Sequence, residues 1–262
     1  MSRIAVVSAM HPELAAVLAW LPEAQKQTVA GREFVLGRWH GQEVVAVLSR
    51  IGKVAAATTA TVLIERFDVQ AVLFTGVAGG VSPLAQVGDV VVASAFVQHD
   101  MDASPLFPIY EVPLYGRSHF ATDTALTAAL AQAAQAALAQ GLLDAAVLAD
   151  IGMHAGKGSG KTADQRTAQV HQGLIISGDR FVSTRMESQR LQQALPQALA
   201  VEMEGAAVAQ VCSDYGVPFA AMRTISDRAD DDAHADFLKF VDRVASRYSA
   251  AILDHFFTQR SR

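Results

Sequence analysis

The sequence has little cysteine and little charge. Cys212 is the single cysteine among 262 residues, so the chain has no disulfide framework of its own. Charged residues make up 18% of the chain and apolar residues 51%, a balance that excludes intrinsic disorder. A lone thiol is typical of a reducing compartment. Because no activating base lies near Cys212 in the sequence, we expect it to be a small core residue on a helix.

Long apolar runs and basic blocks are also missing. No stretch approaches the length of a membrane span, and the apolar run after Arg3 is too short for a signal peptide. The net charge of -5 offers no basic surface for nucleic acid or anionic lipid. We therefore expect a soluble cytoplasmic protein that binds neither nucleic acid nor membrane.

Short apolar runs alternate with helical patterns along the chain. This alternation predicts an α/β fold around a mostly parallel sheet. Because no repeat or linker-like break in composition occurs, we expect one domain over residues 1–262. Polar stretches at 102–118 and 152–169 are typical of long loops. The predicted strands are 4–7, 34–39, 44–48, 71–74, 87–95, 174–176, 199–203 and 219–225, and the predicted helices are 14–21, 53–66, 121–140, 205–215 and 237–257.

Three carboxylates follow predicted strands. Glu13 comes after the first strand, Glu204 after 199–203 and Asp227 after 219–225. Ligands of open α/β sheets bind beyond the carboxyl ends of the strands, so a parallel sheet would bring these groups to one rim. Glycine-containing turns are expected at the same rim, after residues 74 and 176. Alone, each carboxylate could be a helix cap or a turn residue. Together, without a cationic cluster, they favour acid–base chemistry at a sugar over phosphate binding.

Several ordered motifs then resemble one family, the 5′-methylthioadenosine/S-adenosylhomocysteine nucleosidases. The resemblance runs from Ile4 to the C-terminal helix, with a divergent stretch around 142–170. The motifs are IAVVSAMHPEL (4–14), FTGVAGG (74–80), VGDVVVA (87–93), ISGDRFV (176–182), VEMEGAA (201–207) and RTISDRAD (223–230).

The resemblance implies the nucleoside phosphorylase/hydrolase fold, a three-layer α/β/α sandwich around a twisted mixed sheet. It implies hydrolysis of the N-glycosidic bond of adenine thionucleosides, a step of methionine salvage, with no cofactor and no metal. By motif position, Asp227 is similar to the acid that protonates adenine N7. Glu204 is similar to the carboxylate that holds the ribose hydroxyls, and Glu13 to the base that orients water.

The same resemblance assigns further positions around the substrate. Met203 would pack beneath the ribose, Phe181 and Val182 would form the adenine slot, and Phe237 would line the 5′-alkylthio pocket. Ile51 and residues 99–107 resemble segments that the family uses across a homodimer interface. Substrate contacts are also implied for Val77, Ala78, Gly79 and Ser226.

One position departs from the family pattern. Val77 lies in the glycine-rich segment where some members carry a hydroxyl residue. A polar contact beside Asp227 is therefore either missing or supplied by Ser226.

Other functions remain open at this stage. A phosphorylase of the same fold would need cations for phosphate, whereas Phe74 and Thr75 precede the glycines and Glu13 would repel phosphate. A nucleosidase of the same fold could act on a nucleoside with a different 5′-substituent, such as a futalosine. A non-catalytic nucleoside-binding protein would not need an acid.

Two further patterns are weaker. AGKGSGKT at 155–162 loosely resembles a phosphate-binding loop, but its first glycine is replaced by Ala155, so we expect a surface loop. His99, Asp100 and Asp102 lack further residues at ligand spacing, so we expect a polar turn rather than a metal site.

Overall fold

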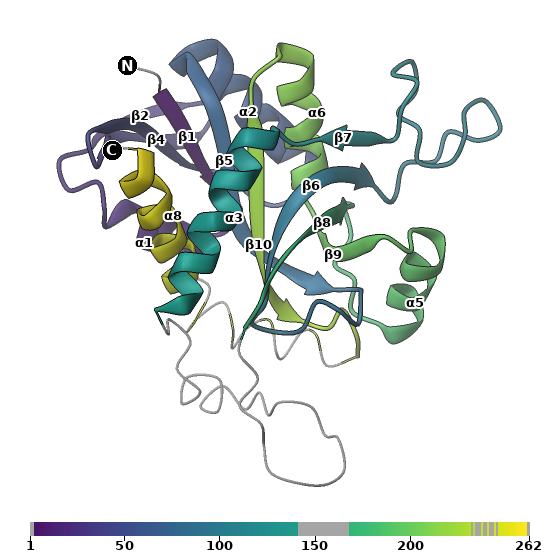
Figure 1. Cartoon of the computed structure of the whole chain (residues 1–262). Coiled ribbons are helices and arrows are strands. Elements are labelled where there is room, and N and C mark those ends of the chain that lie inside the picture. Colours follow the sequence, from purple (N-terminus) through teal and green to yellow (C-terminus); the bar gives the residue numbers. More distant parts are fainter. Residues whose placement is uncertain are drawn as a thin grey trace, which may run out of the picture.

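Strands and helices alternate in the computed structural model, which describes residues 3–140, 168–231, 233, 237, 240, 244 and 246–260 (Figure 1). The strands are β1 (Arg3–Ser8), β2 (Gln25–Val29), β3 (Arg32–Trp39), β4 (Gln42–Leu48), β5 (Val69–Gly80), β6 (Val90–Gln98), β7 (His119–Ala121), β8 (Val170–Ser177), β9 (Ala198–Glu202) and β10 (Phe219–Asp227). The helices are α1 (His11–Leu18), α2 (Lys53–Phe67), α3 (Thr124–Ala139), α5 (Arg185–Ala194), α6 (Gly205–Tyr215) and α8 (Ser246–Arg260).

All these strands join one sheet, in the order β10-β6-β8-β9-β5-β1-β4-β3-β2, with β7 on β6. Half of the pairings among the described strands are parallel and half are antiparallel. The expectation of a mostly parallel sheet is therefore wrong, and the mixed sheet that the family resemblance implied is confirmed. Two parallel groups, β4-β1-β5-β10 and β6-β8-β9, run against each other where they meet.

An additional pairing between β10 and β5 closes five of the strands into a ring: β10, β6, β8, β9 and β5. β9 meets β5 only near both carboxyl ends, where Gly79 pairs with Val201 and Gly80 with Ala200. Because the antiparallel strands cross at these ends, the chain segments that follow β1, β5, β9 and β10 approach one another. The residues of the predicted site are therefore brought together by the closed ring of strands, and not by the common edge of a parallel sheet that the sequence analysis expected.

Helices cover both faces of the sheet. In β1, Ile4 and Val6 belong to one buried apolar cluster, while Ala5 and Val7 belong to another, as the two-residue period of a strand requires. Residues of α1, α3 and α8 complete the first cluster, and residues of α2 and α6 complete the second. The three-layer α/β/α arrangement follows from this alternation.

The glycine cluster that was expected to form a turn lies inside β5. None of Gly76, Gly79 and Gly80 has a positive φ. A Cβ on Gly76 would lie 2.9 Å from Glu13 Oε1, and one on Gly80 would lie 2.7 Å from the Ala85 carbonyl oxygen. These glycines therefore serve close approach of neighbouring groups rather than chain reversal, which is why the turn prediction is wrong.

Other boundaries differ for local reasons. The helix predicted from residue 121 begins at Thr124. Ala121 belongs to β7 and pairs with Ala95 of β6, and the Asp123 side chain caps the helix by accepting a hydrogen bond from Leu126 N at 2.8 Å. β2 was not predicted, since its sequence QKQTV is polar and exposed at the sheet edge. The helix predicted over 237–257 corresponds to α8 and helical residues before it.

Three other predictions can be compared directly. The helix predicted over 205–215 is confirmed as α6, and Cys212 is buried in it; burial raises the pKa of its thiol to about 12. The loop predicted over 102–118 is present. No helix within the described ranges combines the length and apolarity needed to cross a membrane.

The start of α6 yields a prediction about stability. A Cβ on Gly205 would lie 2.2 Å from Cε1 of the fully buried Phe96, so Gly205→Ala should lower the free energy of unfolding by about 1–3 kcal/mol through overpacking. Urea unfolding followed by circular dichroism measures this. Adding Phe96→Leu should recover part of the loss, and additive effects of the two changes would contradict the proposed clash.

Candidate active site

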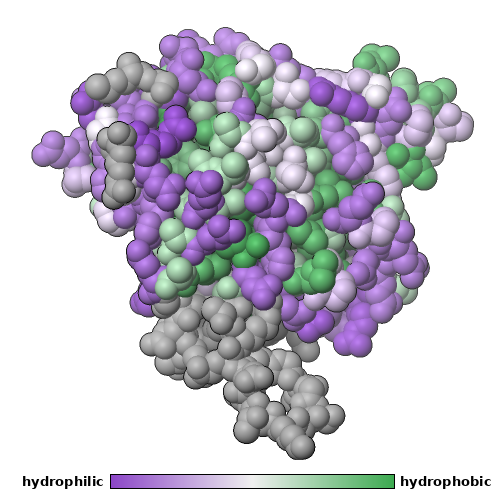
Figure 2. Space-filling model, in the orientation of Figure 1, coloured by the Kyte–Doolittle hydropathy of each residue, from purple (hydrophilic) through white to green (hydrophobic). Residues whose placement is uncertain are grey.

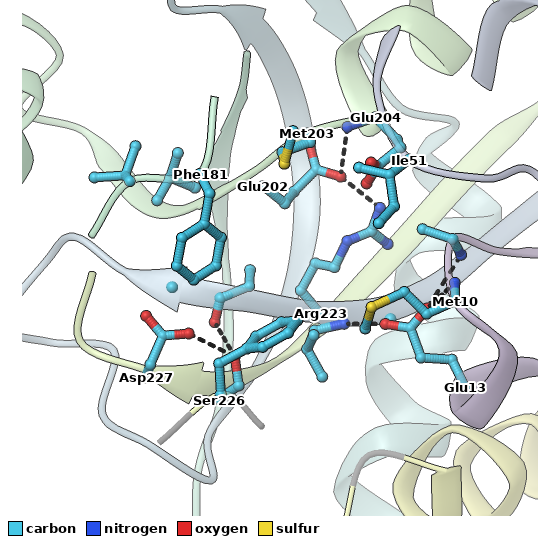
Figure 3. A pocket seen from close by; sticks show the side chains of 18 of the residues that line it. Met10, Glu13, Ile51, Phe181, Glu202, Met203, Glu204, Arg223, Ser226 and Asp227 are labelled. Carbon is cyan, nitrogen blue, oxygen red and sulfur yellow. Dashed lines mark hydrogen bonds and ion pairs between the residues drawn. The ribbon is translucent and has the colours of Figure 1, made fainter. Parts of the chain in front are cut away.

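A cavity of about 250 Å³ opens where β1, β4, β5, β8, β9 and β10 end (Figure 3). All twelve residues that the sequence analysis named as catalytic or substrate-binding line it. In Figure 3, Asp227 and Ser226 lie at one end of the cavity and Met10 and Glu13 at the other. The structure thus places the named residues around one space, while their individual roles remain predictions.

Glu13 is held by three backbone N–H groups. Its Oε2 accepts hydrogen bonds from Ala9 N at 3.1 Å and Met10 N at 2.9 Å, and its Oε1 accepts one from Val77 N at 3.0 Å. α1 positions it, because a glutamate in the first turn can reach back to the residue before the helix. Burial raises the pKa of Glu13 above its usual value, against the opposing effect of these N–H groups and the Arg223 charge.

Glu204 is the residue immediately before α6, two positions after the end of β9. Its Oε1 accepts a hydrogen bond from Gly52 N at 2.8 Å, which links it to the segment between β4 and α2. Burial, and then the negative charge of Glu202, raise the pKa of Glu204 to about 8.

Asp227 is the last residue of β10 and is buried. Its Oδ1 accepts a hydrogen bond from Ala229 N at 2.8 Å, and its Oδ2 lies 2.8 Å from the Ser226 hydroxyl. Ser226 Oγ also lies 3.3 Å from the Ala78 carbonyl oxygen. Ser226 therefore supplies a polar contact to this carboxyl group, where Val77 has none to offer.

The middle of the cavity is apolar. The rings of Phe181 and Phe237 meet edge to face, with centroids 5.4 Å apart, so the two residues form one wall. Val182, which is buried, Met203, which precedes Glu204, and the exposed Ile51 also line the cavity. Such a surface suits the face of a purine and an apolar substituent.

The backbone of β5 forms the floor of the cavity. Val77, Ala78 and Gly79 line it as part of a continuous strand. A Cβ on Gly79 would lie 3.0 Å from Asp227 Oδ1 and 3.0 Å from Ala229 Cβ, so a larger residue here would crowd this carboxyl group.

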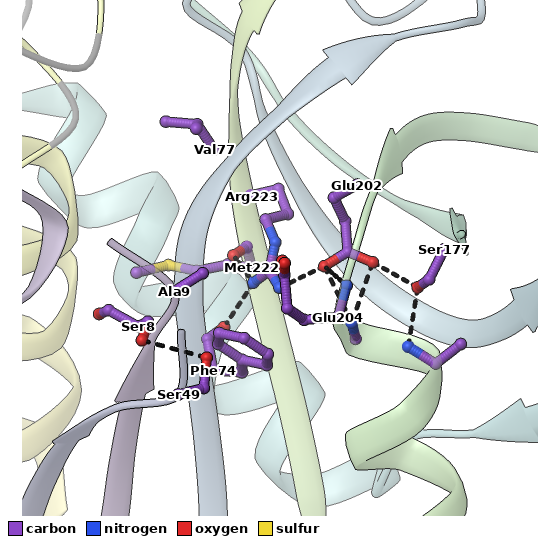
Figure 4. Close-up of polar contacts among 12 residues, drawn as sticks. Ser8, Ala9, Ser49, Phe74, Val77, Ser177, Glu202, Glu204, Met222 and Arg223 are labelled. Atoms are coloured by element: carbon purple, nitrogen blue, oxygen red, sulfur yellow. Dashed lines mark hydrogen bonds and ion pairs between the residues drawn. The ribbon is translucent and has the colours of Figure 1, made fainter. Parts of the chain in front are cut away.

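Sequence reasoning assigned no role to Arg223 and Glu202. Arg223 is 1% exposed, and its Nη2 donates to Glu202 Oε2 at 2.6 Å (Figure 4). Glu202 also accepts hydrogen bonds from the Ser177 hydroxyl and from Glu204 N and Gly205 N. An arginine in the middle of the apolar strand FAAMRTISD was the available signal, because a buried guanidinium requires an anionic partner.

A metal site finds no support in the described part of the chain. No group of three or more His, Cys, Asp or Glu side chains there is arranged to hold a metal ion. Asp100 pairs instead with Lys53, and Asp102 accepts a hydrogen bond from Ser104 N. The phosphate-loop pattern at 155–162 lies outside the described residues.

The whole-chain comparison now decides the family. The model of the Phosphorylase superfamily matches residues 3–258. The chain belongs to the Phosphorylase superfamily. Within the superfamily it is 35% identical over 251 residues to a 5′-methylthioadenosine/S-adenosylhomocysteine nucleosidase from Shewanella sp. (strain W3-18-1), with 96% of each chain covered.

Solved structures of the superfamily agree with the fold. The 5′-methylthioadenosine/S-adenosylhomocysteine nucleosidase of Neisseria meningitidis, in complex with methylthio-immucillin-A, is similar with a TM-score of 0.83 and 30% identity, covering 99% of this chain and 100% of that one. The futalosine hydrolase of Helicobacter pylori is similar with a TM-score of 0.80 and 31% identity, covering 98% of each.

The raised pKa of Glu204 predicts how stability depends on pH. Below about pH 4.5 the carboxyl group of Glu204 is protonated in both the folded and the unfolded protein, and above about pH 8 it is ionised in both. Between these values the unfolded chain has lost this proton while the folded protein still keeps it. The free energy of unfolding of the substrate-free protein should therefore fall as pH rises across this range. Glu204→Gln should make the fall shallower. Urea unfolding midpoints measured across the range test this, with Glu23→Gln, an exposed position, as control; identical pH dependence of wild type and Glu204→Gln would contradict it.

Proposed function

We propose that the chain hydrolyses the N-glycosidic bond of 5′-methylthioadenosine and S-adenosylhomocysteine, releasing adenine and a 5-thioribose, and that it serves methionine salvage. The observation that carries this proposal is the pair of buried carboxyl groups at opposite ends of one apolar cavity, Glu13 on three backbone N–H groups and Asp227 beside Ser226. Cleavage of such a bond needs a base for water on one side and an acid for the leaving purine on the other.

Asp227 acts as the acid in this proposal. Protonation of adenine N7 makes adenine a neutral leaving group, and a buried carboxyl group can keep a proton for that purpose. The Ser226 hydroxyl has one proton and two acceptors within reach, Asp227 Oδ2 and the Ala78 carbonyl oxygen. When Asp227 carries its proton, Ser226 turns to Ala78. When the proton leaves, Ser226 turns back and stabilises the carboxylate.

Glu204 and Glu13 act on the sugar side. Glu204 binds the ribose hydroxyls and stabilises the positive charge that develops on the ribosyl group as the bond breaks. Glu13 takes a proton from the attacking water. Its raised pKa makes it a stronger base than an exposed glutamate.

The charge of the cavity favours water over phosphate as nucleophile. Arg223 is the one buried cation among the described residues that line the cavity, and its Nη2 is engaged by Glu202. Arg180 lies at the rim, and its side chain is 72% exposed and paired with Glu187. Phosphate binding needs unengaged cations, and the nearby glutamates would repel an anion.

Futalosine-type nucleosides are the second candidate substrates, because the futalosine hydrolase of Helicobacter pylori is among the similar structures. They are purine nucleosides with a different 5′ substituent on the ribose, which would lie near the open edge at Ile51.

We also propose an isologous homodimer. Exposed apolar side chains gather on the projecting connection between β6 and β7, at the upper right of Figure 2, with Leu106 84% and Leu114 91% exposed. Ile51 at the cavity edge is exposed as well. A second copy would cover these side chains near the 5′ end of each cavity. The cytoplasmic location and the one-domain organisation stay predictions.

Adenine release tests the proposed function directly. Purified protein incubated with 5′-methylthioadenosine, S-adenosylhomocysteine or futalosine should release adenine from the first two and no free purine base from futalosine, as followed by chromatography of the released bases. Added phosphate should neither speed the reaction nor give a 5-thioribose 1-phosphate product. Phosphate-dependent turnover would identify a phosphorylase instead, binding without turnover would identify a nucleoside-binding protein, and turnover of futalosine alone would identify the second candidate.

The proposed acid can be tested separately from the fold. Asp227→Asn keeps the shape but removes the transferable proton, so kcat should fall by about 10²–10⁴-fold. Substrate affinity should change much less, because adenine is not yet protonated in the ground state. Ser226→Ala, which keeps the acid but removes its partner, should cost less than Asp227→Asn. Near-normal turnover by Asp227→Asn would show that the acid is another group.

A further inference from the structure

The segment after β8 carries Phe181 and Val182 into the cavity, and its first residue packs tightly against the end of β6. A Cβ on Gly178 would lie 2.4 Å from His99 Nε2 and 3.1 Å from Asp100 Cγ. Gly178 N donates to the Glu202 carbonyl oxygen at 3.1 Å. The segment that is assigned to adenine therefore starts from a fixed point beside Asp100.

The next residue, Asp179, caps a helix from outside. The residue before α2 is Gly52, which has φ 94° and no side chain that could cap the helix. Asp179 Oδ1 accepts a hydrogen bond from Lys53 N at 2.7 Å and so takes the place of a cap residue. Its negative charge also favours the positive end of the helix.

Lys53 and Asp100 close this arrangement into a ring of contacts. Lys53 Nζ donates to Asp100 Oδ1 at 2.6 Å and to Gln98 Oε1 at 3.0 Å, and Asp179 N donates to Asp100 Oδ2 at 2.9 Å. The Lys53 side chain is 16% exposed, so solvent screens the pair only in part. Burial acts to raise the pKa of Asp100, but the Lys53 ammonium and the Asp179 N–H together hold it below its usual value.

Lys53 also follows Gly52, the residue whose N–H binds Glu204, the carboxylate proposed to hold the ribose hydroxyls. Gly52 N donates to Glu204 Oε1, and Lys53 N donates to Asp179. Consecutive N–H groups thus fix the two segments that a nucleoside would bridge, with Glu204 on one side and the segment 178–182 on the other.

We propose that Lys53, Asp100 and Asp179 form a clamp that sets the position of the adenine segment relative to Glu204, with Lys53 and Asp100 as positioning residues for glycosidic cleavage. This proposal rests on the proposed function. None of the three touches the reacting atoms. The clamp acts on a ligand that spans both segments, because a displacement of about 1 Å between groups that hold one substrate can cost about 100-fold in rate.

The test compares a ligand that spans the clamp with one that does not. Lys53→Met, Asp100→Asn and the double variant are assayed for kcat and KM with 5′-methylthioadenosine, and their affinity for adenine alone is measured by calorimetry. Lys26→Met is the control, because this lysine forms a surface ion pair with Glu33 on a different part of the sheet. Thermal unfolding of each variant is recorded in parallel.

We expect each single variant to lower kcat/KM for the nucleoside by about 10–100-fold, while the affinity for adenine stays within about threefold. The kcat/KM of the double variant should be only slightly lower than that of the more impaired single variant, because both substitutions break the same Lys53–Asp100 contact. Lys26→Met should match wild type.

Three results would overturn the proposal. Equal losses for adenine and the nucleoside would show that the contacts build the adenine segment itself. Unchanged kcat/KM would show that the clamp has no effect. A lower kcat with unchanged KM, together with a smaller number of adenine molecules bound per chain in calorimetry, would show that part of the protein is simply unfolded. Asp100→Asn, which preserves shape, gives the answer even if Lys53→Met does not fold. If wild type released no adenine, the proposed function would be wrong, and the clamp would be judged on the dissociation constants of the nucleoside and adenine.

Discussion

The buried pair of Arg223 and Glu202 is the interaction on which the rest of the site depends. Arg223 occupies the middle of β10, with its guanidinium 4.2 Å over the ring of Phe74 and donating to backbone carbonyl oxygens as well as to Glu202. Removing one partner of such a pair leaves an uncompensated buried charge, which costs about 3–5 kcal/mol. The same Glu202 accepts N–H groups from the start of α6, so the pair fixes the position of Glu204.

The pair also sets the electrostatics of the cavity. Glu202 takes the direct contact with Arg223, while the more distant Arg223 charge only partly offsets the burial that raises the pKa of Glu13 and Glu204. In the substrate-free protein, burial and the charge of Glu202 therefore favour the protonated form of Glu204. A ribosyl group that gains positive charge beside it reverses this preference, because an adjacent cation favours the carboxylate. Glu204 would thus become negatively charged as positive charge develops on the ribosyl group, so the site would bind the transition state more tightly than the substrate.

Sequence periodicity predicted the elements whose burial is regular. β1 is a short apolar run buried on both faces, and α6 is a largely buried helix that ends at a glycine, so both were predicted to within one residue at each end. The exposed strand β2 has no such signal. The glycine cluster misled the prediction, because glycine marks both turns and close approaches, and only the position of Glu13 against Gly76 separates the two.

The site residues were predicted by motif position, whereas the charges between them were not. Glu202 and Glu204 stand two residues apart, and no local rule says which of them faces Arg223 and which faces the cavity. That assignment depends on the register that places β9 between β8 and β5, a long-range property of the sheet. The closed ring of strands is likewise a long-range property that no local sequence pattern predicts, since it depends on one additional pairing between β5 and β10.

β5 explains how far apart the two proposed catalytic groups lie. A Cβ on Gly76 would meet Glu13, and one on Gly79 would meet Asp227, so the two carboxyl groups rest against the same strand three residues apart. At about 3.3 Å per residue, the backbone step between these two glycines is about 10 Å along the strand. Glycosidases that use water directly keep their two carboxyl groups about 6.5–9.5 Å apart, leaving room for water on one face of the sugar and the leaving group on the other. The two glycines thus let separate carboxyl groups approach one strand at different points, so that the groups proposed to act on water and on the leaving purine are held by the same backbone.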